Sequence, residues 1–258
     1  PWLKPIRAIY TTGQHVIIRE LIEAMPNLEI VACRGTGYDA IDLELMREKG
    51  LFLSYGAGAN AASVADQAMA LMLAAMRQVP QRDGAIRQGK WMESRELLPI
   101  PTQKRLGIIG MGKVGEGLAR RAAGFDMTIA YNTRGKRDDV PYRYYPSVLE
   151  LAKNSDILIA CIPGGKETRH IIDGAVLDAL GPTGFVVNVA RGSVLDTDAL
   201  VAALREGRLG GAGLDVVDGE PEVPAALLEA PNVVMSPHIG ARSPEASDMA
   251  FDLAVANL

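Results

Sequence analysis

The sequence has little of the features that would place it in a specialised class of protein. Only two of its 258 residues are cysteines, 5% are aromatic, and no apolar run is long and uninterrupted enough to span a membrane. Cys33 and Cys161 each lie in an apolar run, so we expect buried thiols and a reducing, cytoplasmic location rather than a disulfide framework. The first residues, PWLKPIRAIY, lack the pattern of a secretory signal. With no basic excess (net charge −4), nothing favours a nucleic acid or a membrane surface as partner.

Short apolar runs alternate with amphipathic stretches of helical length nearly throughout the chain. Such alternation predicts right-handed crossovers and parallel sheets covered on both faces. The predicted strands are residues 6–10, 28–32, 51–54, 105–109, 127–131, 156–161, 184–189, 211–216 and 233–236. The predicted helices include residues 16–25, 43–49, 63–78, 112–123, 196–206 and 245–258. The fold class that follows is α/β, with two doubly wound, Rossmann-like parallel-sheet domains and a cleft between them.

The alternation also predicts how the chain is divided into domains. Residues 1–56 hold only three predicted strands, too few for a whole domain, and the last predicted helix is expected to return to them. We therefore expect residues 1–56 plus 241–258 to form a substrate-binding domain that is incomplete at both termini. Residues 57–240 are expected to form the dinucleotide-binding domain. Clefts between two such domains are where small ligands bind.

A glycine-rich motif, GMGKVG at Gly110–Gly115, directly follows a predicted strand and begins a predicted helix. A bare GxGxxG is a weak signal, but strand before and helix after are the context of a dinucleotide-binding turn. Gly110 permits the tight turn, Gly112 lets the backbone approach a pyrophosphate, and Gly115 lets the helix lie close to the strand. The alternative is a structural turn without a ligand.

The end of the next predicted strand indicates which nicotinamide cofactor is bound. An acidic residue there would bond the ribose 2′-hydroxyl, but this chain has Asn132, followed by Thr133, Arg134, Lys136 and Arg137. Arg134 can pair with a 2′-phosphate through two hydrogen bonds, Thr133 can donate to it, and Lys136 and Arg137 add positive charge nearby. We therefore expect NADP(H) in preference to NAD(H), the alternative being a solvated basic loop.

Polar segments follow three predicted strands at the carboxyl side of the second sheet. Arg191 follows one strand, His238 lies in a Ser-Pro-His turn after another, and Glu220 belongs to an acidic loop between them. Ligands of doubly wound folds bind outside the carboxyl ends of the strands. A guanidinium can grip a carboxylate, and an imidazole held by a carboxylate can pass a proton near neutral pH. From the pattern alone, a structural role for His238 stays equally open.

Six segments in a fixed order carry a resemblance across essentially the whole chain. They are GTGYDAID at residues 35–42, NAASVAD at 60–66, GMGKVG at 110–115, NVARG at 188–192, GLDV at 213–216 leading to Glu220-Pro221, and SPHIG at 236–240. In this order they resemble the D-isomer-specific 2-hydroxyacid dehydrogenase family. Further segments, such as YNTR and LREGRLGGAGLDV, are most similar to its glyoxylate/hydroxypyruvate and hydroxyphenylpyruvate reductases.

The resemblance implies an oxidoreductase that transfers hydride from NADPH to a small 2-keto acid of the glyoxylate or hydroxypyruvate type. Arg191 would bind and polarise the substrate, His238 would be the general acid, and Glu220 would hold the protonated imidazole. Backbone N–H groups at Thr36 and Gly37 would take the substrate carboxylate.

The family's cofactor contacts can be carried over in the same way, and no metal is implied. They fall on Val64, Gly110, Gly112, Lys113, Val114, Gly115, Asn132, Thr133, Arg134, Cys161, Ile162, Pro163, Thr168, Val189, Ala190, Arg191, Asp215, His238 and Gly240. The family also implies a homodimer, with residues 63–78 and 81–91 near the interface.

Two other functions remain as alternative hypotheses at this point. One is a dehydrogenase of another small anion, such as formate or phosphite. The other is a nucleotide-binding, corepressor-like regulatory protein, because such proteins keep much of the same set of motifs.

Overall fold

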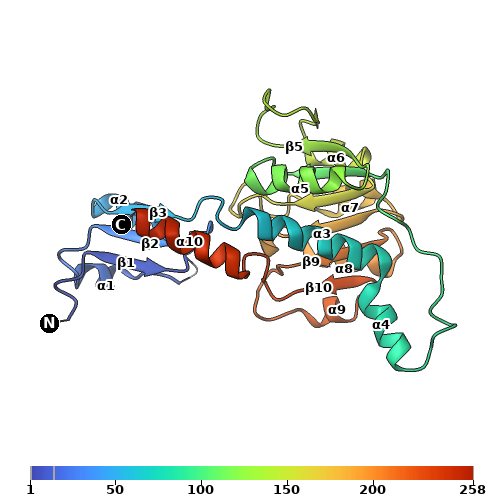
Figure 1. Ribbon diagram of the computed structural model, residues 1–258, viewed down its shortest axis with the longest axis horizontal. Coiled ribbons are helices and arrows are strands. Elements are labelled where there is room, and N and C mark those ends of the chain that lie inside the picture. The colour runs from blue at the N-terminus through green and yellow to red at the C-terminus, as the bar shows by residue number, and fades with distance from the viewer. Residues whose placement is uncertain (1, 14, 258) are drawn as a thin grey trace. The chain divides into compact units, whose positions relative to one another are not determined.

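The protein is described here by a computed structural model covering residues 2–13 and 15–257, and the chain divides into two compact units (Figure 1). The first unit consists of Pro1–Ser63 and Ala241–Leu258, and the second of Val64–Gly240. Each unit has its own parallel sheet and its own hydrophobic core. The first boundary between the units, after Ser63, lies within helix α3 (Ala61–Arg77), several residues after the boundary expected from the sequence at residue 56.

The first unit is built on a three-stranded parallel sheet in the order β1-β2-β3. Its elements are β1 (Ala8–Thr11), α1 (Arg19–Glu23), β2 (Ile30–Cys33), α2 (Leu43–Glu48), β3 (Phe52–Tyr55) and α10 (Pro244–Asn257). Helices α1 and α2 bury Ile22 and Leu45 against Val31 in one cluster. Helix α10 packs on β2 and β3 and buries three alanines, whose small side chains allow a close approach.

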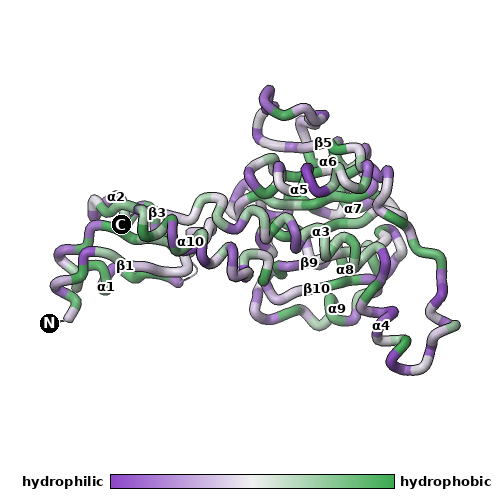
Figure 2. The backbone as a smooth tube through the Cα atoms, in the orientation of Figure 1, coloured by the Kyte–Doolittle hydropathy of each residue, from purple (hydrophilic) through white to green (hydrophobic). Residues whose placement is uncertain are grey.

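The second unit contains a seven-stranded, wholly parallel sheet in the order β10-β9-β8-β7-β4-β5-β6. Its strands are β4 (Arg105–Ile109), β5 (Thr128–Asn132), β6 (Arg143–Tyr144), β7 (Ile157–Ala160), β8 (Phe185–Asn188), β9 (Gly211–Leu214) and β10 (Val233–Met235). The central strands β7, β8 and β9 are buried along their whole length, and Figure 2 shows this interior as predominantly hydrophobic. Strands with both faces covered are expected to read as continuous apolar runs.

Helices cover both faces of this second sheet. They are α3 (Ala61–Arg77), α4 (Val79–Arg87), α5 (Lys113–Ala123), α6 (Val148–Lys153), α7 (Gly174–Leu180), a 3₁₀ turn η1 (Gly192–Val194), α8 (Thr197–Arg205) and α9 (Ala225–Leu228). Helix α3 approaches β9 so closely that a Cβ on Gly213 would lie 3.0 Å from the Leu71 side chain. Helix α7 contacts both α6 and α8, and the three helices share one large core cluster of the second unit.

The α/β fold class predicted from the sequence is confirmed, and its nine strands all occur within a few residues of their expected bounds. The two-residue strand β6 was not predicted, because it does not lie in an apolar run of the sequence. No helix in residues 2–13 and 15–257 is long and apolar enough to span a membrane.

Candidate active site

The glycine-rich turn lies at the point where the order of strands in the second sheet reverses. Strand β4 pairs with β5 on one side and with β7 on the other. The strands that follow β4 in the sequence are therefore added first on one side of it and then on the other. In such sheets the crevice at the carboxyl ends of the diverging strands is the ligand site. Gly110 follows β4 directly, and Cys161 follows β7.

A side chain would be excluded from Gly110 and from Gly115 of the turn for different structural reasons. Gly110 has φ +100°, a conformation that side chains disfavour, and a Cβ there would lie 2.7 Å from Ile162. A Cβ on Gly115 would overlap the Gly110 carbonyl oxygen, so this glycine brings α5 onto the strand.

Gly112 is different, because nothing lies within 4 Å of the place its Cβ would take. It is the N-cap of α5 and has no side chain with which to cap the helix. Lys113 and Val114 begin this helix. Open space beside uncapped helix N–H groups fits a pyrophosphate.

The loop after β7 forms the other side of this crevice. Burial raises the pKa of the Cys161 thiol to about 12, so the thiol stays protonated and can donate to the Gly110 carbonyl at 3.0 Å. Thr168 closes the following loop by donating to the Pro163 carbonyl at 2.9 Å. Cys161, Ile162, Pro163 and Thr168 therefore belong to one folded edge beside the glycine turn.

The loop after β5 is held by side chains at its two ends. The Asn132 side chain donates to the Tyr145 carbonyl at 2.8 Å, which turns its amide into the protein. The fully buried Tyr131 hydroxyl accepts from the Arg137 N–H at 2.8 Å and donates to the Arg137 carbonyl at 3.1 Å. Thr133 donates to the Gly135 carbonyl at 2.6 Å.

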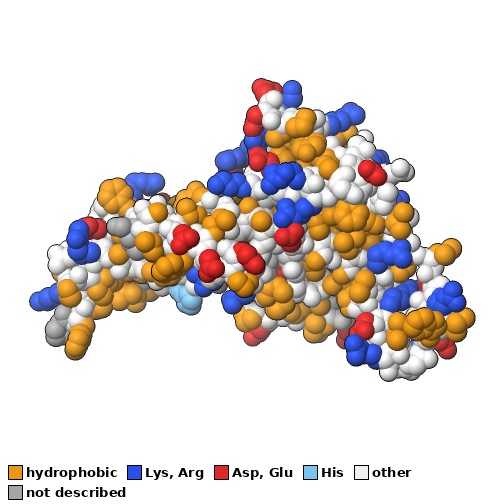
Figure 3. Space-filling view, in the orientation of Figure 1, with side chains coloured by type: hydrophobic (Ala, Val, Ile, Leu, Met, Phe, Trp, Pro, Cys, Tyr) orange, Lys and Arg blue, Asp and Glu red, His pale blue; other side chains and the backbone are white. Residues whose placement is uncertain are grey.

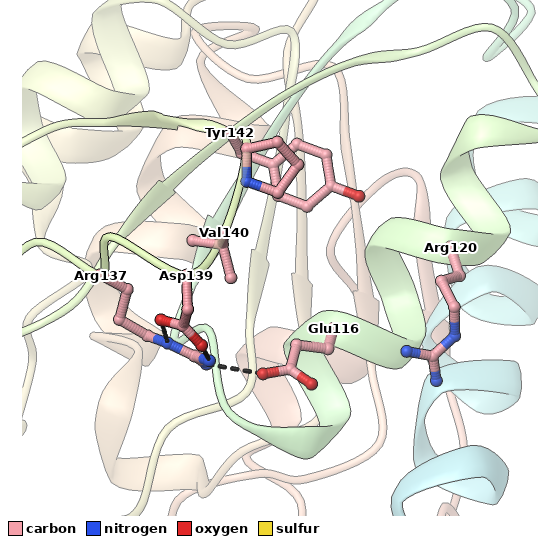
Figure 4. Close-up of a pocket in the computed structure, with 7 residues that line it drawn as sticks. Glu116, Arg120, Arg137, Asp139, Val140 and Tyr142 are labelled. Carbon is pink, nitrogen blue, oxygen red and sulfur yellow. Dashed lines mark hydrogen bonds and ion pairs between the residues drawn. The ribbon is translucent and has the colours of Figure 1, made fainter.

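The cations of this loop do not have equivalent surroundings. The Arg137 guanidinium donates to the Met111 carbonyl, to Glu116 at 2.6 Å and to Asp139 (Figure 4). The hydrogen bonds that Arg137 donates to Asp139, and next to Glu116, raise the pKa of Arg137 above its usual range. Arg137 thus braces the loop against the glycine turn and against α5.

A cavity of about 310 Å³ is lined by Glu116 and Arg120 of α5 and by Arg137, Asp139 and Tyr142 of the loop after β5. Figure 4 shows Arg137 bonded to Glu116 and Asp139, with Arg120 farther along α5. Arg134 is exposed, and no hydrogen-bond or ion-pair partner of its side chain occurs among the described residues. Lys136 lies 3.4 Å from Asp138. Arg134 is accordingly the cation of this loop that keeps its charge and donors available.

Arg191 lies in a bend that follows β8. The buried Asn188 side chain accepts from the Ala190 N–H at 3.0 Å and donates to the Arg191 carbonyl at 2.9 Å. A Cβ on Gly192 would overlap the backbone of Val217, so this bend packs directly on the loop after β9. Val189 and Ala190 are buried, and they bring Arg191 beside the loop that carries Glu220.

His238 and Glu220 form a direct pair in the second unit. His238 Nδ1 lies 2.5 Å from Glu220 Oε1, and the other carboxylate oxygen accepts from the Val217 N–H at 3.4 Å. Within the described part of the chain Nε2 of His238 has no hydrogen-bond partner. A carboxylate on Nδ1 selects the tautomer in which that nitrogen is protonated, leaving Nε2 to exchange a proton with a ligand.

The turn that carries His238 is organised by the buried Asp215, which is 3% exposed. The carboxylate of Asp215 accepts from the Ser236 hydroxyl at 2.6 Å and from the N–H groups of Ile239 and Gly240 at 3.0 and 2.8 Å. A Cβ on Gly240 would lie 2.8 Å from Asp215 and 3.6 Å from Val64. Val64, Asp215 and Gly240 therefore lie together.

Thr36 and Gly37 lie in the first unit, in the loop that follows β2. The Thr36 hydroxyl donates to Asn60 at 2.7 Å, and Gly13 packs against the Gly37 carbonyl in a conformation with φ +76°. The N–H groups of Thr36 and Gly37 have no acceptor among the residues that the structure describes. Two adjacent free N–H groups are suited to a carboxylate.

Within the second unit, the structure puts His238 and Glu220 in contact and packs the Arg191 bend on the loop after β9. These residues and the glycine turn all follow strands of one sheet. Three contributors were not expected: Asn188 as the clamp of the Arg191 bend, Ser236 as a partner of Asp215, and Gln67. The first two lie within motifs of the sequence. Gln67 carries no signal, because its partner Ser236 is 169 residues away.

Comparison with known proteins places this geometry in a family. Residues 69–240 match the family described as D-isomer specific 2-hydroxyacid dehydrogenase, NAD binding domain. The chain belongs to the D-isomer-specific 2-hydroxyacid dehydrogenase family. The resemblance inferred from the motifs is therefore confirmed.

Its relatives include reductases from plants and bacteria. The chain is 44% identical to a hydroxyphenylpyruvate reductase of Plectranthus scutellarioides and 42% identical to a glyoxylate/hydroxypyruvate reductase A of Arabidopsis thaliana, covering 98% of this chain and 81% of each relative. A solved NADPH-dependent glyoxylate/hydroxypyruvate reductase of Sinorhizobium meliloti, in complex with NADP and malonate, superposes with a TM-score of 0.89 at 36% identity, covering 99% of this chain and 80% of that one.

Proposed function

We propose that the protein reduces a small 2-keto acid to the D-2-hydroxy acid with hydride from NADPH. The observation that carries this proposal is the His238–Glu220 pair at 2.5 Å, beside the Arg191 bend and in the same sheet as the glycine turn. Its relatives with reductase names support the same reaction. Dehydrogenation of formate or phosphite and a purely regulatory role have no comparable support.

The division of labour between the units follows from the same residues. We assign the cofactor to the second unit, with the glycine turn, the loops after β5 and β7 and the Arg191 bend as its binding segments, and the substrate carboxylate to Thr36 and Gly37 in the first. The open space at Gly112 and the uncapped start of α5 fit a pyrophosphate. When bound, NADPH supplies the hydride that reduces the 2-carbon.

The residues of this chain supply the binding and the proton. Arg191 binds the substrate carboxylate and polarises its carbonyl, since a guanidinium offers paired donors to a planar acceptor. Protonated His238 donates its Nε2 proton to the carbonyl oxygen, and Glu220 keeps Nδ1 protonated before and after that transfer. The C=O group gains one hydride and one proton and becomes CH–OH, while the imidazole becomes neutral.

The proposed substrate class is tested by following NADPH oxidation with glyoxylate, hydroxypyruvate and hydroxyphenylpyruvate. We expect saturable turnover above 1 s⁻¹, on the order of ordinary enzymes, with at least one of the three. Formate and phosphite are assayed with NADP⁺ in parallel. Turnover confined to either of these two anions, or to none of the five compounds, would contradict the proposal.

NADP(H) in preference to NAD(H) rests on Arg134, because Arg137 is already bonded to two acids and a carbonyl. Replacing Arg134 by alanine is expected to weaken NADPH binding by roughly 10- to 100-fold, the loss of a charge-assisted hydrogen bond to a phosphate. NADH binding, measured in the same fluorescence titration, should change by less than about twofold, since its ribose carries no phosphate.

Arg120 offers a matched control for this prediction. It is also exposed and lies on α5 at the far side of the cavity of Figure 4. Arg120→Ala should leave both affinities unchanged. Equal weakening of NADPH and NADH by Arg134→Ala would argue against a role in cofactor preference.

We also propose that the protein is a homodimer that associates through the α4 patch. This patch consists of exposed apolar side chains of α4 and the segment after it, Val79, Ile86, Trp91, Met92, Leu97 and Ile100. No residue of α4 is buried, Leu97 is fully exposed, and Figure 3 shows hydrophobic side chains gathered around this helix. Exposed apolar side chains that gather in this way favour association with a second copy.

Replacing Leu97 by aspartate is expected to convert the dimer into a monomer at micromolar concentration, because an unpaired charge would have to be buried in the interface. Light scattering coupled to size-exclusion chromatography measures the mass. Leu228→Asp is the control, since Leu228 is 62% exposed on α9, outside the patch. A Leu97→Asp protein of unchanged mass would show that the α4 patch is not the interface.

Both cysteines are free thiols, which supports a reducing compartment, and we propose the cytoplasm.

A further inference from the structure

The turn that carries His238 has a conformation that needs support from outside the turn. His238 has φ +52°, in the left-handed region that costs a non-glycine residue energy unless the surroundings hold it. Its N–H donates to the Asp215 carbonyl at 2.8 Å, and the Asp215 side chain accepts the next two N–H groups. The orientation of the imidazole therefore depends on where the Asp215 carboxylate lies.

The Asp215 carboxylate in turn depends on one hydroxyl. The Ser236 hydroxyl has a single proton, which it donates to Asp215 Oδ1 at 2.6 Å. The Ser236 oxygen is also 2.8 Å from Nε2 of Gln67. Because the hydroxyl proton is already committed to Asp215, the Gln67 amide must be the donor to Ser236.

Gln67 is held in place by the helix on which it lies. Helix α3 buries Ala68, Leu71 and Met72, and its backbone at Leu71 approaches β9 closely. The side chain thus reaches Ser236 from a rigid element. A directed chain results, in which Gln67 donates to Ser236, Ser236 donates to Asp215, and Asp215 holds the backbone of the His238 turn.

We propose that Gln67 is a positioning residue for the general acid, and that it acts through the direction of its hydrogen bond rather than through packing. This inference rests on the proposed function of His238. An amide can donate to Ser236, whereas a carboxylate at the same place could only accept. A glutamate at position 67 would compete with Asp215 for the single hydroxyl proton, and two acceptors would repel each other across it.

Few charged groups surround the hydrogen-bond chain from Gln67 to Asp215. Asp215 comes from the loop after β9, His238 and its partner Glu220 lie beside the turn, and Asp66 is the neighbouring acid on α3. Asp66 accepts from Arg121 of α5 at 2.5 Å, which lowers the pKa of Asp66 and keeps it ionised. A glutamate at position 67 would therefore face Asp215 as its main negative neighbour, and proton uptake would restore a donor at this position.

The test compares Gln67→Glu with Gln67→Met, which has the same length and no donor. We expect Gln67→Glu to lower kcat by about 30-fold at pH 8 and to recover to within about threefold of wild type near pH 5.5, where the new carboxyl becomes protonated and can donate. Gln67→Met should lose about three- to tenfold at every pH, because it cannot donate at any. Gln103→Glu, the same change at an exposed glutamine, should match wild type.

Amide hydrogen exchange in the cofactor-free protein gives a second readout that needs no turnover. The N–H groups of Ile239 and Gly240 should exchange faster in both Gln67 variants, by about tenfold, as their acceptor becomes less fixed. A Gln67→Glu profile parallel to that of wild type, or unchanged exchange at these two amides, would overturn the inference. If wild type reduces no 2-keto acid, the proposed function fails, while the exchange data still decide whether Gln67 holds the turn.

Discussion

Replacing His238 by asparagine is expected to lower kcat for 2-keto acid reduction by about 10³-fold, within the range that general acids contribute. Asparagine tolerates the φ of +52° found here, so the backbone of the turn should be kept, but an amide cannot deliver a proton. The affinity for NADPH should stay within about twofold of wild type, since His238 is only one of many cofactor contacts that the family implies and the glycine turn and its loops are untouched. Stopped-flow measurement of NADPH oxidation and fluorescence titration of the cofactor separate the two effects.

His170 provides a matched control for this substitution. It also has a left-handed backbone, with φ +51°, its ring lies 3.6 Å from Asp196, and His170 itself is not among the residues proposed to contact cofactor or substrate. His170→Asn should therefore change kcat by less than about twofold, as is usual away from a site. If His238→Asn retained normal turnover, another group would have to supply the proton.

Replacing Arg191 by leucine is expected to lower kcat/KM by about 10³-fold, because paired, charge-assisted hydrogen bonds to the substrate would be lost. Arg191→Lys should recover only a small part of this loss, since an ammonium cannot reproduce the planar pair of donors. Much of the change should appear as a higher KM for the keto acid.

The control for Arg191 is Arg208→Lys. Arg208 is partly exposed and bonded to Glu206 and Asp178 at the surface, so its replacement should leave both constants unchanged. A normal KM in Arg191→Leu would show that another residue anchors the substrate carboxylate.

The fold could be predicted well wherever periodicity and burial agree. Strand β4 was placed at its observed bounds, because a continuous apolar run ends at the glycine motif. Helix α4 was not predicted, since it has no buried face and hence no apolar periodicity. The first boundary between the units could not be located either, because it falls inside the continuous pattern of α3.

The site could be predicted as far as its parts lie within local motifs. The strand ends suggest an imidazole held by an acid, the family resemblance assigns Glu220 to His238, and the structure puts the two in contact. In contrast, the sequence singles out Arg134 as the phosphate partner but does not show how Arg137 is held. Only the fold shows that Glu116 and Asp139 bind Arg137 and leave Arg134 available.

The contact between Gln67 and Ser236 illustrates the remaining limit. A glutamine on the buried side of a long apolar helix gives no indication of its partner, and this one bonds to a residue at the far end of the same unit. Such contacts depend on how α3 packs on β9, which side-chain periodicity does not specify.

The central claim is that the protein reduces a 2-keto acid stereospecifically, with His238 as the proton donor. It is tested most directly by mixing wild type or His238→Asn with NADPH and one keto acid at a time: glyoxylate, hydroxypyruvate or hydroxyphenylpyruvate. Chiral chromatography then resolves the product of each reaction whose product is chiral. We expect wild type to form the D-2-hydroxy acid from a prochiral substrate in equal amount to the NADPH oxidised, and His238→Asn to form almost none. Failure of wild type to consume any of these keto acids, an L product, or equal rates for the two proteins would contradict the account.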